Sequence, residues 1–118
     1  MKYQSDFERS DRVGQQIHEI VAKLFLTEIE DPRLRKIQII DVDMSPNLRN
    51  ARVYYVMLHG EEPSKEVKEA VQGVAGFVKH EISSRLSLRY VPDIDFRFDE
   101  AVLRGRHIDN LLSKLHDD

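Results

Sequence analysis

Cysteine is absent from this 118-residue sequence, so the chain can form neither disulfides nor thiolate zinc sites. That absence suits a reducing cytosol. No apolar run approaches the roughly 20 residues that a membrane-spanning helix needs, and residues 1–13 lack the apolar stretch of a secretory signal. We therefore expect a soluble cytoplasmic protein that has no membrane segment.

A positive net charge, the usual mark of a nucleic-acid-binding protein, is missing as well. The chain has 18 Lys and Arg residues against 21 Asp and Glu residues, which makes a formal net charge of −3. Binding to RNA would therefore require the cations to gather on one side of the molecule. The charges are unevenly placed along the chain, with acids between Glu61 and Glu69 and cations near residues 33–36, 49–52, 79–89 and 104–107.

The length fits a single domain over residues 1–118, whose core we expect from about residue 6 to about residue 115. Apolar residues recur at helical spacing from Val13 to Leu24, which predicts an amphipathic helix there. Ser5 and Ser10 are the two candidate N-caps of this helix. The helix should end before Pro32, because a residue that precedes proline disfavours the helical conformation.

The next segment predicts a β-hairpin. Ile40, Val42 and Met44 alternate with aspartates, as expected of a half-buried strand. Ile39 and Ile40 break the alternation, which indicates either a bulge or a strand buried on both faces. Ser-Pro-Asn at residues 45–47 is typical of a turn, and the Val- and Tyr-rich residues 51–58 predict the second strand.

A helical stripe then runs from Val67 to Leu86, preceded by Pro63 and Ser64 at the helix start. Two glycines interrupt the stripe and predict two helices that meet at a kink, formed by Gly73, Val74, Ala75 and Gly76. The Gly-x-x-Gly spacing matches the phosphate-clamping loop of KH domains. Close packing of the two helices is the alternative explanation of the glycines, and we expect the apolar Val74 and Ala75 to face the core.

The last regular segments complete an α+β domain. Ile94, Phe96 and Phe98 alternate with charged residues and predict a strand over residues 93–99. A short C-terminal helix is expected over residues 107–115. The order is α-β-β-α-(kink)-α-β, and it favours a three-stranded mixed sheet with helices packed on one face.

Catalytic motifs find little support in the sequence. His18-Glu19 begins like a zinc-protease helix, but residue 22 is alanine where the second histidine would stand. Asp93 and Asp95 share a strand face, which allows a weak hypothesis of a metal-dependent hydrolase; a solvated acidic face is the simpler interpretation. We therefore predict no catalytic residue, no metal and no cofactor.

Five segments in order resemble the ribosome-binding factor A family: DRVGQQI at residues 11–17, EDPRL at 30–34, NARVYYV at 50–56, LRYVPDIDF at 88–96 and GRHIDNLL at 105–112. The resemblance implies a type II KH-like fold with an Ala-x-Gly kink in place of the glycine loop. In this chain the first alanine of that kink is Val74. It also implies a non-catalytic, monomeric factor that binds the immature 30S ribosomal subunit, assists maturation of the 5′ end of 16S rRNA and its terminal helix, and supports growth in the cold.

Basic side chains around the kink and the helix ends are the expected rRNA contacts: Arg9, Arg12, Lys79, Arg85, Arg89, Arg104 and Arg106. Each of them has solvated surface charge as its alternative interpretation. Tyr54, Tyr55 and Tyr90 are candidates for stacking on bases, although tyrosines of strands commonly pack in the core.

A protein–protein adaptor of KH-like or ferredoxin-like shape is the rival prediction. It would use the exposed sheet face or the acidic stretch from Glu61 to Glu69, and the net negative charge favours it. The family motifs favour the ribosomal factor. The acidic stretch is open to two interpretations, a solvated surface or a docking site for another maturation factor.

Overall fold

The structure, a computed structural model, describes residues 2–100, with side chains described from Glu8 onward. The elements in chain order are α1 (Lys2–Thr27), the 3₁₀ helix η1 (Pro32–Leu34), β1 (Ile37–Met44), β2 (Asn50–Met57), α2 (Lys65–Gly73), α3 (Ala75–Arg85) and β3 (Asp93–Phe98). The predicted α+β class and the α-β-β-α-(kink)-α-β order are confirmed. The C-terminal helix predicted over residues 107–115 lies outside the described residues.

Helix α1 begins earlier than either predicted cap, because its helical backbone runs from Lys2 through both Ser5 and Ser10. Ser10 is only 3% exposed and stands three residues before the buried Val13, so it belongs to the core-facing stripe of the helix. Two backbone N–H groups, those of Glu28 and Ile29, donate to the Leu24 carbonyl at 2.9 Å each and end the helix before Pro32.

The hairpin of β1 and β2 contains the bulge that the sequence indicated. The antiparallel register shifts between Ile39, which pairs with Tyr55, and Asp41, which pairs with Tyr54. The extra residue is Ile40, and it moves Ile39 onto the core-facing side together with Met44. The expectation that Ile40 would face the core is therefore wrong, because a bulge reverses the alternation on one of its sides.

Strand β3 pairs with β2 in parallel, which gives a mixed sheet in the order β1-β2-β3. Asn50 at the start of β2 lies opposite Asp93 at the start of β3. Parallel neighbours need a crossover connection, and α2 and α3 supply it. The two strands therefore begin at the same end of the sheet.

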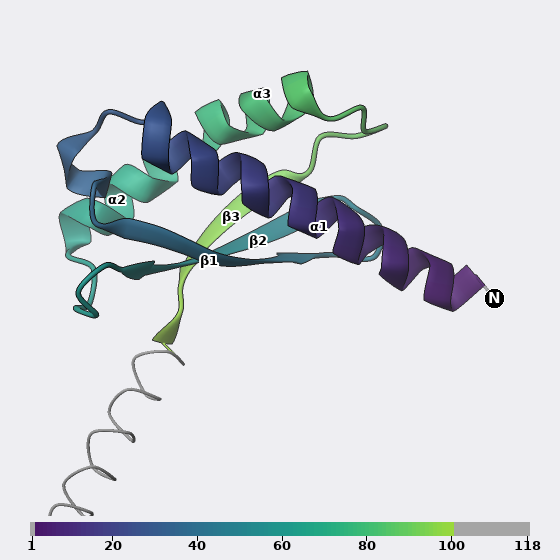
Figure 1. Cartoon of the computed structure of the whole chain (residues 1–118), viewed down its shortest axis with the longest axis horizontal. Coiled ribbons are helices and arrows are strands. Elements are labelled where there is room, and N and C mark those ends of the chain that lie inside the picture. The colour runs from purple at the N-terminus through teal and green to yellow at the C-terminus, as the bar shows by residue number, and fades with distance from the viewer. Residues whose placement is uncertain (1, 101–118) are drawn as a thin grey trace, which may run out of the picture.

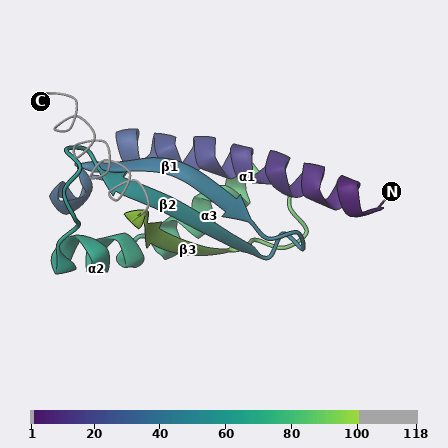
Figure 2. The same cartoon turned by 90° about the horizontal axis from the view of Figure 1, so that it is seen from below.

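Helices α1 and α3 lie side by side over one face of the sheet, while the other face has no described helix on it (Figures 1 and 2). The core lies between these layers. Ile17, Val21 and Ile82 from the helices are fully buried there, and Val53 and Phe96 meet them from the sheet. Burying a side chain of this size stabilises a fold by roughly 1.5–3 kcal/mol. The apolar contacts between the helices and the sheet therefore explain why both helices pack on this face.

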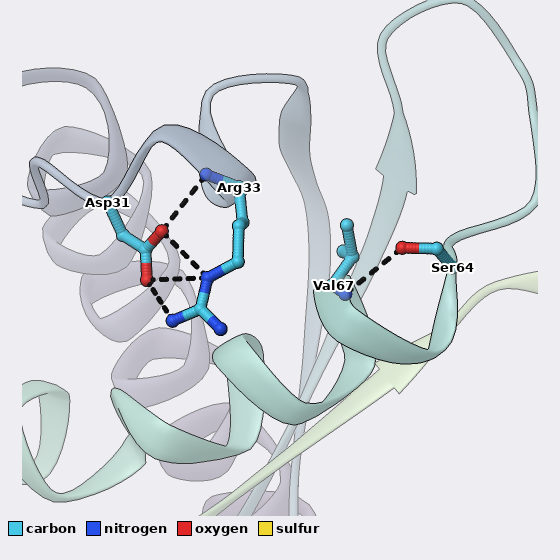
Figure 3. A network of polar contacts seen from close by, with 4 residues as sticks. All are labelled: Asp31, Arg33, Ser64 and Val67. Carbon is cyan, nitrogen blue, oxygen red and sulfur yellow. Dashed lines mark hydrogen bonds and ion pairs between the residues drawn. The ribbon is translucent and has the colours of Figure 1, made fainter.

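Two local caps set the start of η1 and of α2 (Figure 3). The Asp31 carboxylate accepts a hydrogen bond from the Arg33 backbone N–H at 3.0 Å and pairs with the Arg33 guanidinium at 2.6 Å. The Arg33 side chain lowers the pKa of Asp31 through these hydrogen bonds. Ser64 Oγ accepts from the Val67 N–H at 3.2 Å, which confirms the predicted helix start.

None of the helices within residues 2–100 combines the length and the apolar character that crossing a bilayer requires.

Replacing Ser64 by alanine removes the side-chain acceptor at the start of α2. We expect Ser64→Ala to lower the free energy of unfolding by about 1 kcal/mol, measured by urea denaturation followed by circular dichroism. Ser84→Ala is the matched control, because Ser84 Oγ donates only to the Glu81 carbonyl within α3. Equal losses from the two variants would show that the cap does not stabilise α2.

Candidate nucleic-acid interface

A pocket of about 350 Å³ opens where three segments meet: the N-terminal half of α1, the β1–β2 turn and the α3–β3 loop. These segments lie at the same end of the molecule in both views (Figures 1 and 2). The residues that line the pocket are Arg9, Pro46, Asn47, Leu48, Arg49, Leu88, Arg89 and Tyr90. Two of the predicted rRNA contacts, Arg9 and Arg89, are thus brought together.

Hydrogen bonds of the β1–β2 turn hold Arg49 at the rim of this pocket. Ser45 Oγ donates to Asn47 Oδ1 at 2.7 Å, and the same amide oxygen accepts from the Arg49 N–H at 3.1 Å. Leu48 adopts a left-handed conformation with φ of 63°, which turns the chain toward β2. The Arg49 carbonyl then accepts from the Asp93 N–H at 2.8 Å, so the turn is tied directly to the start of β3.

Two guanidinium groups lie close to the ring of Tyr90. The Cζ atom of Arg49 lies 4.5 Å from the ring centroid, and that of Arg89 lies 5.4 Å from it. Both distances are within the range in which a cation is attracted to the π-face of an aromatic ring. Tyr90 nevertheless remains 49% exposed, so part of this residue is accessible to a ligand.

The pocket carries concentrated positive charge. Its lining, counted over the side chains that the structure describes, includes three arginines and neither aspartate nor glutamate, a formal charge of +3 in a chain whose sum is −3. Within residues 8–100, Arg9, Arg49 and Arg89 have no carboxylate at ion-pair distance. Guanidinium groups without a carboxylate partner favour an anionic ligand, above all phosphate, which their planar fork contacts through two hydrogen bonds.

Two other predicted contacts are occupied by internal ion pairs. Lys79 Nζ lies 2.8 Å from Asp93 Oδ1, and this pair lowers the pKa of Asp93. Arg85 Nη2 lies 3.1 Å from Glu28 and 3.3 Å from Glu81. Either side chain would have to leave a carboxylate before it could contact a phosphate.

The remaining predicted contacts are Arg12, Arg104 and Arg106. Arg12 is exposed on α1, three residues after Arg9, and it does not line the pocket. Arg104 and Arg106 lie outside the described residues.

The kink between α2 and α3 lies at the other end of α3 from the pocket (Figure 1). Helix α2 ends at Gly73, α3 begins at Ala75, and the intervening Val74 packs against the core. A methyl group added at Gly73 or Gly76 would meet no atom of the described residues within 4 Å, neighbours in the chain and the backbone of the same helix aside. Close helix packing therefore does not explain these glycines, and the backbone of the kink is open on that side.

The three candidate stacking tyrosines occupy different environments. Tyr55 is 3% exposed and packs beside the Phe98 ring, with centroids 6.0 Å apart, so it belongs to the core. This burial excludes Tyr55 as a stacking candidate and confirms the alternative, packing in the core. Tyr54 is half-buried on the opposite side of β2, and Tyr90 alone lines the pocket.

The two carboxylates considered for metal chemistry each have a cation beside them. Asp93 pairs with Lys79, and Asp95 pairs with Arg97 at 2.9 Å. Within the described residues no group of three or more metal-ligating side chains comes together. The geometry of this strand therefore adds no support to the hydrolase hypothesis.

Sequence reasoning singled out Arg49 as a basic residue but did not place it at the site. The missed signal was the parallel pairing of β2 and β3, since the segments before two parallel strands meet at one end of the sheet. With that pairing assumed, the turn that ends at Arg49 and the loop that contains Arg89 and Tyr90 would have been expected side by side.

The family model described as "Ribosome-binding factor A" matches residues 9–112 of the chain. A protein of Citrifermentans bemidjiense with that name is 35% identical over 107 residues, which cover 91% of this chain and 90% of the relative. One from Desulfatibacillum aliphaticivorans is 40% identical over 107 residues, 91% of this chain and 87% of the relative. The crystal structure of ribosome-binding factor A from Thermus thermophilus shares the fold, with a TM-score of 0.65 and 19% identity over 75% of this chain and 93% of that one.

The ion pair between Lys79 and Asp93 can be tested by titrating the Asp93 carboxyl group. Because Lys79 lowers the folded-state pKa of Asp93, the pair stabilises the fold at neutral pH, and this contribution disappears as the pH falls through that pKa. We expect Lys79→Met to raise the pKa of Asp93 toward its ordinary value, as measured by carboxyl-carbon NMR titration. Asp31, whose pKa is lowered by Arg33, serves as the internal control and should not move.

Proposed function

The chain belongs to the ribosome-binding factor A family, and from that membership we propose that it is an assembly factor that binds the small ribosomal subunit. The observation that supports this function from the molecule itself is the pocket with three arginines. Ribosomal RNA is the principal polyanion of a ribosomal subunit, and phosphate contacts dominate the affinity of proteins for nucleic acids. A basic pocket on an acidic protein directs such a partner to one end of the molecule.

The proposal includes the finer role that the resemblance implies. The protein acts in the cytoplasm as a monomer formed by one KH-like RNA-binding domain, and it binds the immature 30S subunit near the 5′-terminal helix of 16S rRNA. It supports maturation of that 5′ end and growth in the cold, without catalysis and without a cofactor. Family membership supports these statements.

Among the predicted contacts, Arg9 and Arg89 are the strongest, and Arg49 joins them. All three line one pocket and have no described carboxylate partner. Arg12 extends the same basic end along α1. Lys79 and Arg85 contribute less to the binding free energy. Each must give up its ion pair with a carboxylate to contact a phosphate, so it gains only the difference in free energy between the two ion pairs. Arg104 and Arg106 remain predicted contacts from the sequence alone.

The physical role of such a factor is to favour one arrangement of the rRNA over another. A bound protein shifts an equilibrium only by its difference in affinity for the two states. The arginines of the pocket come from three segments that pack on the sheet or lead directly into its strands, so one framework positions the guanidinium groups that would bind phosphates. Misfolded RNA helices exchange more slowly at low temperature, which explains why the need for the factor would be greatest in the cold.

Sedimentation of a lysate through a sucrose gradient tests the function. We expect the protein to travel with free small subunits, and Arg89→Gln to reduce its affinity for purified subunits about tenfold, since a hydrogen bond to a charged group is worth about 1.5–3 kcal/mol. Arg97→Gln is the matched control, because Arg97 pairs with Asp95 away from the pocket. Sedimentation with neither subunits nor ribosomes would favour the adaptor instead.

Added salt gives a second test of the same contact. Each phosphate of single-stranded RNA that the arginines neutralise adds about −0.7 to the slope of log affinity against log salt concentration, so contact with one to three phosphates predicts a slope between about −0.7 and about −2. Affinity for the purified subunit should therefore fall as salt is raised from low to moderate concentration. A flat dependence would contradict binding through the arginines.

A further inference from the structure

We propose that the pocket holds one unpaired nucleotide of a single-stranded RNA segment, with its phosphate among Arg9, Arg49 and Arg89 and its base stacked on Tyr90. This inference rests on the proposed function, to which it adds the form of RNA that the pocket selects. It is carried by the composition of the pocket, by the exposed tyrosine ring and by the size of the cavity.

The charges of the pocket define the part that binds phosphate. Guanidinium groups reach it from α1, from the β1–β2 turn and from the α3–β3 loop, and the described part of the lining contains no acidic side chain. The three arginines thus stand on three separate segments that line one cavity. A phosphodiester that enters it can therefore receive hydrogen bonds from more than one side.

The apolar part of the lining defines the place of the base. Leu48, Leu88 and Pro46 line the same cavity as the Tyr90 ring. Unpaired bases are recognised in proteins by stacking on aromatic rings and on the planes of arginine guanidinium groups. The Cζ atoms of Arg49 and Arg89 lie 4.5 and 5.4 Å from the centroid of this ring, so a base that stacks on Tyr90 would also come close to guanidinium groups.

We expect the pocket to prefer single-stranded RNA because the bases of a duplex are not available for stacking on Tyr90. In an A-form helix the bases are stacked inside, and a protein contacts mostly phosphates and 2′-hydroxyl groups. Such a ligand would use the arginines but would leave the Tyr90 ring and the leucines uncovered. The cavity of about 350 Å³ is of the size that encloses a small ligand, which suits one extruded nucleotide.

Backbone hydrogen bonds hold one segment of the pocket, the β1–β2 turn, which reduces the ordering that binding requires there. The Arg49 carbonyl is bonded to the Asp93 N–H at 2.8 Å, and the Ser45 N–H donates to the Asn50 carbonyl at 2.9 Å across the base of the turn. These two bonds hold the β1–β2 turn against the start of β3. Arg49 therefore has less backbone freedom to lose on binding than a residue of an untethered turn would have.

Fluorescence anisotropy with labelled oligoadenylate, alone or annealed to oligouridylate, tests the inference. We expect the full chain to bind the single strand more tightly than the duplex. Tyr90→Leu should weaken binding of the single strand about 5- to 100-fold, the effect of losing one stacked base, and should leave duplex binding unchanged. Tyr90→Phe keeps the ring and should bind within about twofold of the original chain.

Phe77→Leu is the matched control, since Phe77 is an aromatic residue of α3 near the kink that is 41% exposed and does not line the pocket. It should bind the single strand as the original chain does. Because Tyr90 and Phe77 are both exposed, thermal melts of the two variants should agree with that of the original chain. A weakening by Phe77→Leu equal to that by Tyr90→Leu would place the stacking at the kink and overturn the inference.

The failure of this inference can be distinguished from failure of the proposed function. Co-sedimentation with small subunits that depends on Arg89, together with equal binding of single strand and duplex, would show a phosphate site without base stacking. That result overturns the inference and leaves the function standing. Loss of subunit binding altogether would overturn the proposed function itself.

Discussion

The parallel pairing of β2 with β3 is the constraint on which the rest of the molecule depends. It places Asn50 opposite Asp93 and ties the Arg49 carbonyl to the Asp93 N–H at 2.8 Å. Parallel neighbours cannot be joined by a tight turn, so the chain must cross over through α2 and α3. That crossover covers one face of the sheet together with α1 and returns the α3–β3 loop to the start of β2. The candidate site is therefore a consequence of the topology.

The internal ion pairs explain how an acidic protein presents a basic pocket. Carboxylates of Glu28, Glu81 and Asp93 neutralise Arg85 and Lys79 along α3, whereas Arg9, Arg49 and Arg89 have no described acidic neighbour at ion-pair distance. The net charge of the chain does not reveal this separation of charges. A partner close to the pocket responds to the local electric field, because dissolved salt screens most of the field of the more distant charges.

The kink between α2 and α3 serves the site through geometry. Val74 packs against the core between the two helices, and α3 then runs from the kink toward the loop that carries Arg89 and Tyr90. Glycines at 73 and 76 are not demanded by packing, since a methyl group at either position would meet open space. Because these glycines have no side chain, the backbone of the kink is accessible to solvent. The kink lies at the end of α3 that is remote from the pocket.

The sequence by itself determined the elements of the fold. Helical and strand periodicity and the Ser64 cap depend on residues that are near in the chain, and local sterics and burial encode them. Beside Ile39 the sequence allowed either a bulge or a strand buried on both faces, and the strand register decided for the bulge. Only the tertiary structure decided which of the described basic side chains form an ion pair with a carboxylate and which do not. It also decided that Arg9, Arg49 and Tyr90 share one cavity. These are contacts between distant segments, and they follow from strand pairing, which no local pattern in a single sequence specifies.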